Sequence, residues 1–438
     1  MQIRRRKRRD RKIGRDPVRL VRCLLLLIWA VALAWLAWIA SSSLTPLGGE
    51  ASVRHVREAA DGGPESPRVS GDAKEDAAPP PRDGRDGAEY ERLRKAARSQ
   101  VVPKAQITPQ KSLGSAAEGA DDMRVATDIP GAYLVVPSPI EGEEDNPIQV
   151  VYADHPVAEP ARGLALLLHA CTHSAFKFFA RSGGCDECVG LSEEMRIARI
   201  ALRGGYLPVA VSSANRDSGC WSKGRDVERV RAVLDQAFLR RYRDLSVVAI
   251  GASSGGAFAV ELALDDLAGS ALVMVMDLTD GVIGRLKAAG GSVPVYYAPM
   301  PRDAGRLKRV VRNYDRGPKK GVKLDQSSCV PRPVTEDYLV ERVVGMDRDE
   351  AKELIDKLVH SKHVDGRSHM FLKDPTMSDW RDVLTNGQGD KTRWLGKYTL
   401  ERGNSPLAKA LHRCWAFHEY CSESVEPALG FFEARRKQ

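Results

Sequence analysis

Residues 247–256 read Val-Val-Ala-Ile-Gly-Ala-Ser-Ser-Gly-Gly, and this stretch decides the fold. Its first four residues form the continuous apolar run that is typical of a strand buried on both faces. The residues after Gly256, beginning with Ala257 and Phe258, have the small and apolar character of a buried helix. The pattern therefore predicts a strand, a sharp turn and a helix, with Ser253 at the apex of the turn.

The glycines around Ser253 have a steric reason. Gly251 and Gly255 lie two residues before and two residues after it, where a side chain would collide with the turn. Gly256 lets the helix pack close to the sheet. In a frame shifted by one residue, Ser254 has Ala252 two positions before it and suits the turn less well. The alternative interpretation is a glycine-rich turn that contains serines by chance, but the flanking strand and helix favour a nucleophile.

Outward from this stretch, short β-rich runs alternate with helical patterns. The sequence predicts strands at 132–136, 148–153, 164–169, 207–212, 246–251, 271–276 and 293–297, and helices at 191–203, 227–239, 255–264 and 303–314. Such alternation is typical of an α/β fold with a mostly parallel, doubly wound sheet. Right-handed crossovers place the carboxyl ends of the parallel strands on one edge, where ligands bind.

The alternation of predicted strands and helices ends after residue 315. Helical patterns occupy 335–344 and 347–360, and the sequence predicts no strand between Arg316 and Leu400. The chain ends with helical patterns at 406–418 and 425–435. We therefore expect one domain over residues 129–438, with a helical cap inserted at about 315–405.

The domain resembles the α/β-hydrolase superfamily. The resemblance rests on the Gly-x-Ser-x-Gly turn and on Leu164-Ala-Leu-Leu-Leu-His169-Ala170-Cys171, which is similar to the family's strand that ends in His-Gly. Ala170 stands where the family has Gly. The resemblance implies that Ser253 is the nucleophile and that the backbone amides of Cys171 and Ser254 form the oxyanion hole. His169 and His173 are expected to be structural loop residues.

The family places its acid and its base later in the chain, in the order Ser, Asp or Glu, His. Asp303 follows the predicted strand at 293–297 and is the expected acid, and Asp277, one strand earlier, is the alternative. Either carboxylate could instead only cap the helix that follows it. His418 is the expected base because it precedes the last helix, and His369 is the alternative.

These residues predict a serine hydrolase that acts on a carboxylic ester or related acyl substrate through a Ser253–His418–Asp303 triad. This chemistry requires no metal and no organic cofactor. Peptidases and acyltransferases use the same triad and stay open as alternatives, as does an inactive hydrolase fold that serves as a binding module. Trp221 could line an acyl pocket, or it could be an ordinary packed aromatic residue.

The basic character of the chain is confined to its start. The formal charge is +9 over 438 residues, and residues 1–22 hold eleven Lys or Arg and two Asp, which is the whole excess. The remainder is neutral and lacks the basic surface that nucleic-acid binding requires. We therefore expect no nucleic-acid partner.

An apolar run follows the basic tail. Residues 23–40 carry no charge, and eighteen helical residues span about 27 Å, close to the thickness of a bilayer's hydrocarbon core. We expect a cytosolic tail at 1–19, a transmembrane signal anchor at 20–40 and a disordered stem at 41–128, which is poor in large apolar residues. The domain would then lie in the lumen of the endomembrane system, as in a type II membrane protein. A cleaved signal peptide and a plastid membrane are the alternatives.

Eight cysteines are present, and Cys23 lies in the apolar run. A lumenal domain permits disulfides among the other seven, and the odd number leaves at least one thiol unpaired or paired between chains. The spacing of Cys185 and Cys188 resembles half of a zinc site, but no second pair completes it. We expect these two cysteines to clip a loop to its neighbours.

Overall fold

The computed structural model describes residues 129–385, 394–401 and 403–436. The expected tail (1–19), anchor (20–40) and stem (41–128) lie outside the described residues. Within the described ranges, no helix has the length and apolar character needed to cross a membrane.

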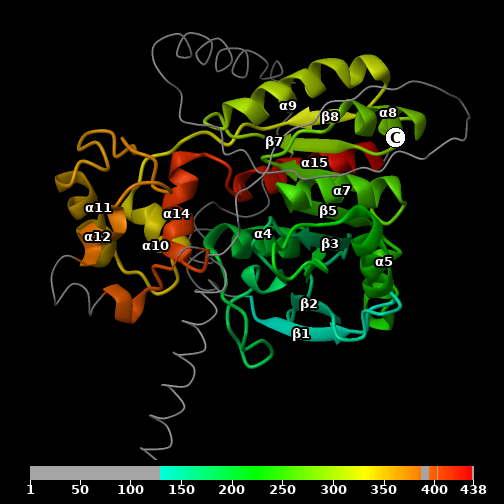
Figure 1. Cartoon of the computed structure of the whole chain (residues 1–438), viewed down its shortest axis with the longest axis horizontal. Helices are drawn as coiled ribbons and strands as arrows, with labels where there is room; N and C mark the ends of the chain where they lie inside the picture. Colours follow the sequence, from blue (N-terminus) through cyan, green and yellow to red (C-terminus); the bar gives the residue numbers. More distant parts are fainter. Residues whose placement is uncertain (1–128, 386–393, 402, 437–438) are drawn as a thin grey trace, which may run out of the picture. The chain divides into compact units, whose positions relative to one another are not determined.

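An eight-stranded sheet lies at the centre of the described structure (Figure 1). Its strands are β1 (Gly131–Val136), β2 (Ile148–Ala153), β3 (Gly163–Leu168), β4 (Tyr206–Val211), β5 (Val247–Ala252), β6 (Ser270–Met274), β7 (Val295–Ala298) and β8 (Leu324–Gln326). They lie in the order β1-β2-β4-β3-β5-β6-β7-β8. β2 is antiparallel to both of its neighbours, and all the other pairs are parallel. The predicted mostly parallel sheet is confirmed.

Helices flank this sheet and form a separate group beyond it (Figure 1). The flanking helices are α4 (Ser192–Arg203), α5 (Lys223–Leu234), α6 (Arg240–Arg243), α7 (Ser254–Leu264), α8 (Asp280–Ala288), α9 (Ala304–Arg316) and α15 (Val425–Arg436). The separate group contains α10 (Glu336–Arg342), α11 (Arg348–His360), α12 (Trp380–Thr385) and α14 (Pro406–Trp415). Short 3-10 turns occur at η1 (Ala175–Lys177), η2 (Ala237–Leu239), η3 (Pro318–Lys320) and η4 (Ser422–Ser424).

Local sequence explains most of these elements. Every residue of β3, β4 and β5 is buried, as expected for apolar strands covered on both faces. α11 begins with a capping box, in which the Asp347 side chain accepts from the Glu350 N–H and the Glu350 side chain accepts from the Asp347 N–H. α9 buries Leu307 and Val310 on one face and begins at the Asp303 cap.

The prediction that no strand lies between Arg316 and Leu400 is wrong. β8 adds a three-residue edge strand, Leu324-Asp325-Gln326, parallel to β7. A strand this short, with two polar residues, carries neither an apolar run nor a clear alternation. The segment after the sheet therefore starts later than the expected residue 315. The sequence prediction also missed α8, which is capped by Thr279 and is only nine residues long.

The buried apolar residues form two clusters. One surrounds the sheet and includes residues from Ile129 to Cys329 and from Ala416 to Phe432. The other joins the separate helices and includes residues from Val334 to Cys414. We call residues 129–333 and 416–436 the sheet region, and the described part of 334–415 the helical region. The buried side chains of Arg342 and Glu193 form an ion pair between the two regions.

Candidate active site

Ser253 lies at the turn between β5 and α7. Its backbone has φ 52° and ψ −122°, a conformation that residues with side chains rarely adopt. A Cβ atom on Gly251 would lie 2.2 Å from the Gly255 oxygen, and one on Gly255 would lie 2.4 Å from the Leu168 oxygen. Both contacts are far inside van der Waals distance, so the turn admits only glycine at these two positions. The strained turn exposes the Ser253 side chain at the carboxyl edge of the sheet.

His418 and Asp303 complete a chain of hydrogen bonds from Ser253. The Ser253 hydroxyl donates to His418 Nε2 at 3.0 Å, and His418 Nδ1–H donates to Asp303 Oδ2 at 2.8 Å. The three residues come from three loops that meet at the sheet edge. The His418 side chain is 35% exposed and that of Asp303 is 12% exposed, so the histidine faces solvent above a buried acid.

Asp303 has a second contact. Its Oδ1 atom accepts from the Arg306 N–H at 3.2 Å, which caps α9, while Oδ2 faces His418. This carboxylate therefore caps a helix and also binds the His418 ring. The cap fixes the carboxylate at the first turn of α9, and this in turn fixes the direction from which His418 is held.

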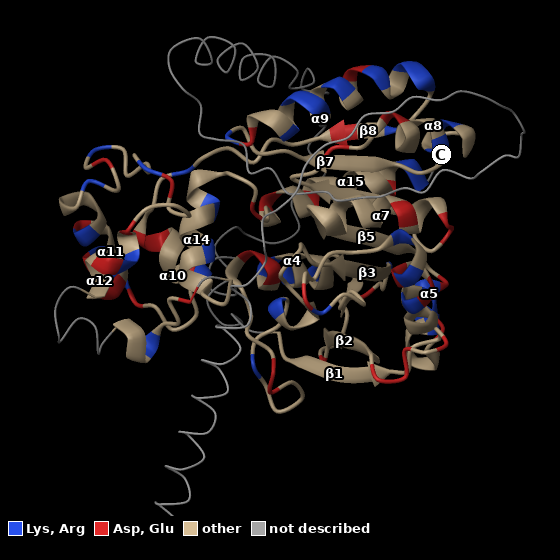
Figure 2. Ribbon diagram, viewed as in Figure 1, with Lys and Arg blue, Asp and Glu red and all other residues tan. Residues whose placement is uncertain are grey.

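The alternative residues lie elsewhere. Asp277 pairs with Arg306 at 2.8 Å and with Arg309 at 3.0 Å. Both arginines belong to α9, a helix rich in basic residues (Figure 2). Burial alone would raise the pKa of Asp277, but hydrogen bonds from these two guanidinium groups hold it below its ordinary value. His369 belongs to the helical region, where its backbone pairs with Val334 and Asp365.

The oxyanion loop, residues 169–173, runs beside the start of α7. The Thr172 N–H donates to the Ser218 oxygen at 2.7 Å and the Ala170 N–H donates to the Tyr420 hydroxyl at 2.7 Å. Between them, the Cys171 N–H has no acceptor within the described part of the chain. Ser254 is the first residue of α7, so its N–H has no carbonyl one turn earlier to bind. These are the two backbone donors named from the sequence.

His169 anchors this loop. It is buried, Nδ1–H donates to the Ala170 oxygen at 2.8 Å, and Nε2 accepts from the Ser213 N–H at 3.0 Å. Burial lowers the pKa of His169 to about 3, so the ring stays neutral. Trp221 donates its indole N–H to the His169 oxygen at 2.7 Å and stacks on Phe258, with the ring centroids 4.6 Å apart. Trp221 is therefore a packed residue that supports the loop.

Three disulfides are present among the described residues: Cys171–Cys220, Cys185–Cys188 and Cys329–Cys421. The first joins the oxyanion loop to the loop after β4, and the Ser254 hydroxyl lies 3.2 Å from the sulfur of Cys171. Cys185 and Cys188 bond to each other and close their own short loop, so the expectation that they clip the loop to its neighbours is wrong. Cys414 is free and buried, and burial raises its pKa to about 12, which makes it an inert thiol.

Sequence reasoning missed two features of the site. It identified no cysteine pair across the loops, because pairing between residues 49 and 92 positions apart depends on the folded chain. It also assigned nothing to Tyr420, although this residue lies two positions after His418. A tyrosine, whose hydroxyl usually finds a hydrogen-bond partner when buried, so close to the expected base was the one signal in the sequence.

No protein-family model and no curated protein matches the chain. Among solved structures, it is similar to esterase 2 of Thermogutta terrifontis, with 14% identity and a TM-score of 0.32 over 55% of this chain and 95% of that one. It is also similar to a putative dienelactone hydrolase of Klebsiella pneumoniae, with 13% identity and a TM-score of 0.33 over 52% and 97% of the two chains. An α/β serine hydrolase homologue of Coxiella burnetii matches with 12% identity and a TM-score of 0.32, over 53% and 97%.

The fold assignment rests on the topology. An eight-stranded sheet in the order β1-β2-β4-β3-β5-β6-β7-β8, antiparallel only at β2, with a sharp turn into a helix after β5, is the α/β-hydrolase fold. The Ser253–His418–Asp303 arrangement lies at the carboxyl edge of this sheet.

Proposed function

We propose that the protein is a serine hydrolase that acts on carboxylic esters through an acyl-enzyme intermediate. One observation carries the proposal: the continuous hydrogen-bonded path from Ser253 through His418 to Asp303 at a strained turn. A hydroxyl that donates to a histidine, whose other nitrogen donates to a buried carboxylate, is the arrangement that activates serine as a nucleophile.

In the first half of the reaction, Ser253 Oγ forms a bond to the carbonyl carbon of the ester. Its proton moves to His418 Nε2, and Asp303 stabilises the imidazolium through the bond to Nδ1. The former carbonyl oxygen carries the negative charge, and the N–H groups of Cys171 and Ser254 bind it. The bond to the leaving alcohol oxygen then breaks, and this oxygen takes the proton from His418.

In the second half, water repeats the sequence on the acyl-enzyme. His418 Nε2 takes a proton from water as the water oxygen attacks the acyl carbon, and the same two amides bind the second oxyanion. The bond to Ser253 Oγ breaks, Oγ recovers the proton from His418, and the carboxylic acid leaves. Asp303 stays ionised throughout.

The test is covalent labelling with a fluorophosphonate probe, together with hydrolysis of p-nitrophenyl acetate. We expect wild-type protein to label and turn over the ester, and Ser253→Ala to do neither. Ser292→Ala, which changes an exposed loop serine, is the matched control and should label like wild type. A wild-type protein that does not label would overturn the proposal and favour a binding module.

The base is tested separately. We expect His418→Ala to lower kcat by about 10³-fold or more, with His369→Ala within about threefold of wild type. The reverse result, with loss of turnover only in His369→Ala, would overturn the assignment of the base. Both histidines have positive φ, 44° at His418 and 53° at His369, so both substitutions meet similar backbone strain.

We further propose that residues 20–40 anchor the protein in a membrane and that the hydrolase domain lies on the oxidising, lumenal side. The three disulfides support this side, because such bonds persist in oxidising compartments. Protease added to sealed microsomes should leave the domain intact until detergent opens them. Cleavage of the domain in sealed microsomes would contradict the lumenal placement.

A further inference from the structure

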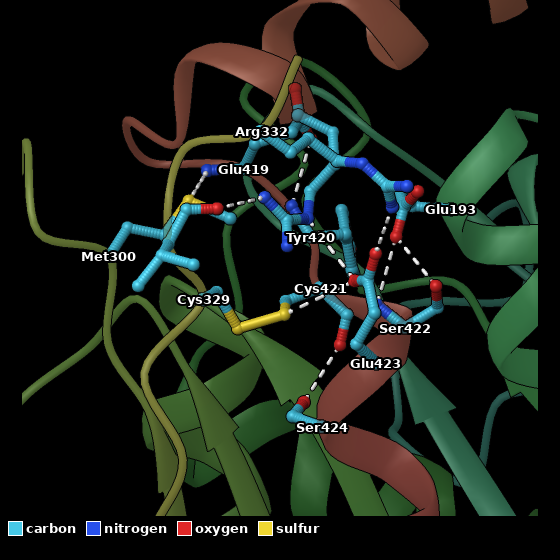
Figure 3. Close-up of a disulfide and its surroundings, with 12 residues drawn as sticks. Glu193, Met300, Cys329, Arg332, Glu419, Tyr420, Cys421, Ser422, Glu423 and Ser424 are labelled. Atoms are coloured by element: carbon cyan, nitrogen blue, oxygen red, sulfur yellow. Dashed lines mark hydrogen bonds and ion pairs between the residues drawn. A yellow bond between two sulfur atoms is a disulfide. The ribbon is translucent and has the colours of Figure 1, made fainter. Parts of the chain in front are cut away.

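The three residues after His418 are buried, although His418 itself is exposed. Glu419 holds the loop that carries His418, residues 416–421, against the segment that leads to Asp303, and Cys421 holds it against the segment after β8 (Figure 3). The Glu419 N–H lies 3.4 Å from Met300 Sδ, and Cys421 forms the disulfide with Cys329. We call residues 416–421 the base loop.

The third residue, Tyr420, reaches the oxyanion loop instead. Its hydroxyl oxygen accepts from the Ala170 N–H at 2.7 Å, which joins two loops that are 250 residues apart in the chain. The ring is held by His173, stacked at 5.9 Å between centroids, and by the edge of Phe178 at 6.0 Å. Burial raises the pKa of Tyr420 well above its ordinary value, so the phenol stays neutral.

Ala170 directly precedes Cys171, whose N–H is one of the two proposed oxyanion donors. The Ala170 oxygen and the Cys171 N–H belong to one planar peptide group, so the direction of one sets the direction of the other. His169 Nδ1–H holds that oxygen at 2.8 Å, and Tyr420 holds the N–H on the other side of Ala170. Ala170 is therefore fixed through both of its backbone polar groups.

We propose that Tyr420 is a positioning residue for the oxyanion hole, so that the base loop also sets where the Cys171 amide points. The inference rests on the proposed serine hydrolase function. Loss of the Tyr420 hydroxyl would leave the partly buried Ala170 N–H without its acceptor, which is costly. The loop would shift to satisfy this N–H, and the Cys171 amide would move with it.

The test is Tyr420→Phe in the full chain, with Tyr338→Phe as the matched control. Tyr338 is equally buried and donates its hydroxyl to the Ala410 oxygen at 2.9 Å, but it lies in the helical region. We expect Tyr420→Phe to lower kcat for p-nitrophenyl acetate about 10-fold to 100-fold with little change in KM, because small displacements of catalytic groups have effects of this size. Tyr338→Phe should change kcat less than about threefold.

The second readout is binding of a trifluoromethyl ketone, which adds Ser253 and places an oxyanion in the hole. In Tyr420→Phe, we expect the inhibition constant to rise by about the same factor as kcat/KM falls, with no such change in Tyr338→Phe. An active wild type with an unaffected Tyr420→Phe, or equal losses in both variants, would overturn this inference alone. A wild type that neither turns over ester nor binds the ketone would overturn the proposed function.

If Tyr420→Phe does not fold, fluorinated tyrosines at position 420 replace it. Fluorine withdraws electron density from the phenol oxygen and weakens it as an acceptor, with little change in ring size. We expect kcat to fall stepwise with the number of fluorine atoms at position 420 and to stay constant when the same residues are placed at 338. An unchanged kcat at position 420 would contradict the role of the hydroxyl.

Discussion

The sheet region and the helical region each have a buried core, but they contribute to the proposed site in different ways. Ser253 and the oxyanion loop each follow directly after a parallel strand, and Asp303 lies in the loop after β7. The helical region supplies none of the three residues of the Ser–His–Asp path. Its contribution is to the base loop, where Lys409 of α14 pairs with the buried Glu419 at 3.0 Å.

This difference shows which parts of the fold fix the positions of the residues in the proposed site. The sheet fixes Ser253, Asp303 and the loop at 169–173 through the segments that follow its strands, which have one position once the register is set. His418 lies on the base loop, which follows α14 of the helical region, and needs clamps. Two contacts supply them, Lys409 on Glu419 and the disulfide between Cys421 and Cys329, and Arg342 pairs with Glu423 at 3.1 Å directly after the base loop.

The largest expected effect comes from a substitution that breaks the hydrogen-bonded path from Ser253 through His418 to Asp303. Asp303→Asn keeps an oxygen that can cap α9 but removes the charge that stabilises protonated His418, so we expect kcat to fall about 10⁴-fold with little loss of stability. Asp277→Asn is the matched control and should leave kcat within about threefold. Steady-state kinetics and thermal unfolding of both variants test this. Loss of kcat in Asp277→Asn alone would assign the acid to the earlier strand.

A second pair of substitutions, with a smaller expected effect on kcat, separates loss of stability from loss of catalysis. Trp380 is fully buried in the helical core, and Phe258 lies in the sheet core beneath Trp221. We expect either residue, changed to Ala, to cost about 3–5 kcal/mol in the free energy of unfolding, measured with urea. Only Phe258→Ala should also lower kcat, because Trp221 holds the oxyanion loop through the His169 oxygen. An equal fall in kcat for Trp380→Ala would mean that the helical region positions the reacting groups directly.

The two regions also differ in how much the sequence could predict. In the sheet region, local patterns identified the mostly parallel sheet and named Ser253, Asp303 and His418, which the structure brings together. Each of these residues is recognised by its neighbours in the chain: glycines around the serine, a strand before the acid and a helix after the histidine. The patterns failed at β8, where three partly polar residues form a strand only because β7 provides the adjacent edge.

The clamps on the base loop could not be predicted in the same way. Tyr420 and Ala170 are separated by 250 residues, and Cys329 and Cys421 by 92. Nothing in the local pattern of either member of these pairs identifies its partner, because the contact exists only once distant segments of the sheet region are folded together. Asp303 shows the intermediate case, since its sequence context predicted the cap on α9, while its hydrogen bond to His418 depends on the fold.

The smallest expected effect concerns the ion pairs of Glu423, at the contact between the sheet region and the helical region. Burial opposes ionisation of Glu423, but Arg413, Arg342 and Arg332 lower its pKa to about 2, well below its ordinary value of 4.5. Above about pH 4.5, Glu423 is charged in both the folded and the unfolded chain, and its ion pairs contribute fully. Between pH 4.5 and 2, the unfolded chain binds a proton that the folded chain does not, so stability falls as the pH falls.

Glu423→Gln should therefore cost about 1 kcal/mol at pH 7, because the carboxylate is partly exposed, and progressively less as the pH approaches 2. The free energy of unfolding in urea, measured for both proteins at pH 7, 4.5 and 3, checks this convergence. Glu426→Gln, at an exposed position of α15, is the control and should give a small, pH-independent difference. A Glu423→Gln difference that stays constant from pH 7 to 3 would show that the arginines do not hold this carboxylate ionised, and that packing alone joins the helical region to η4.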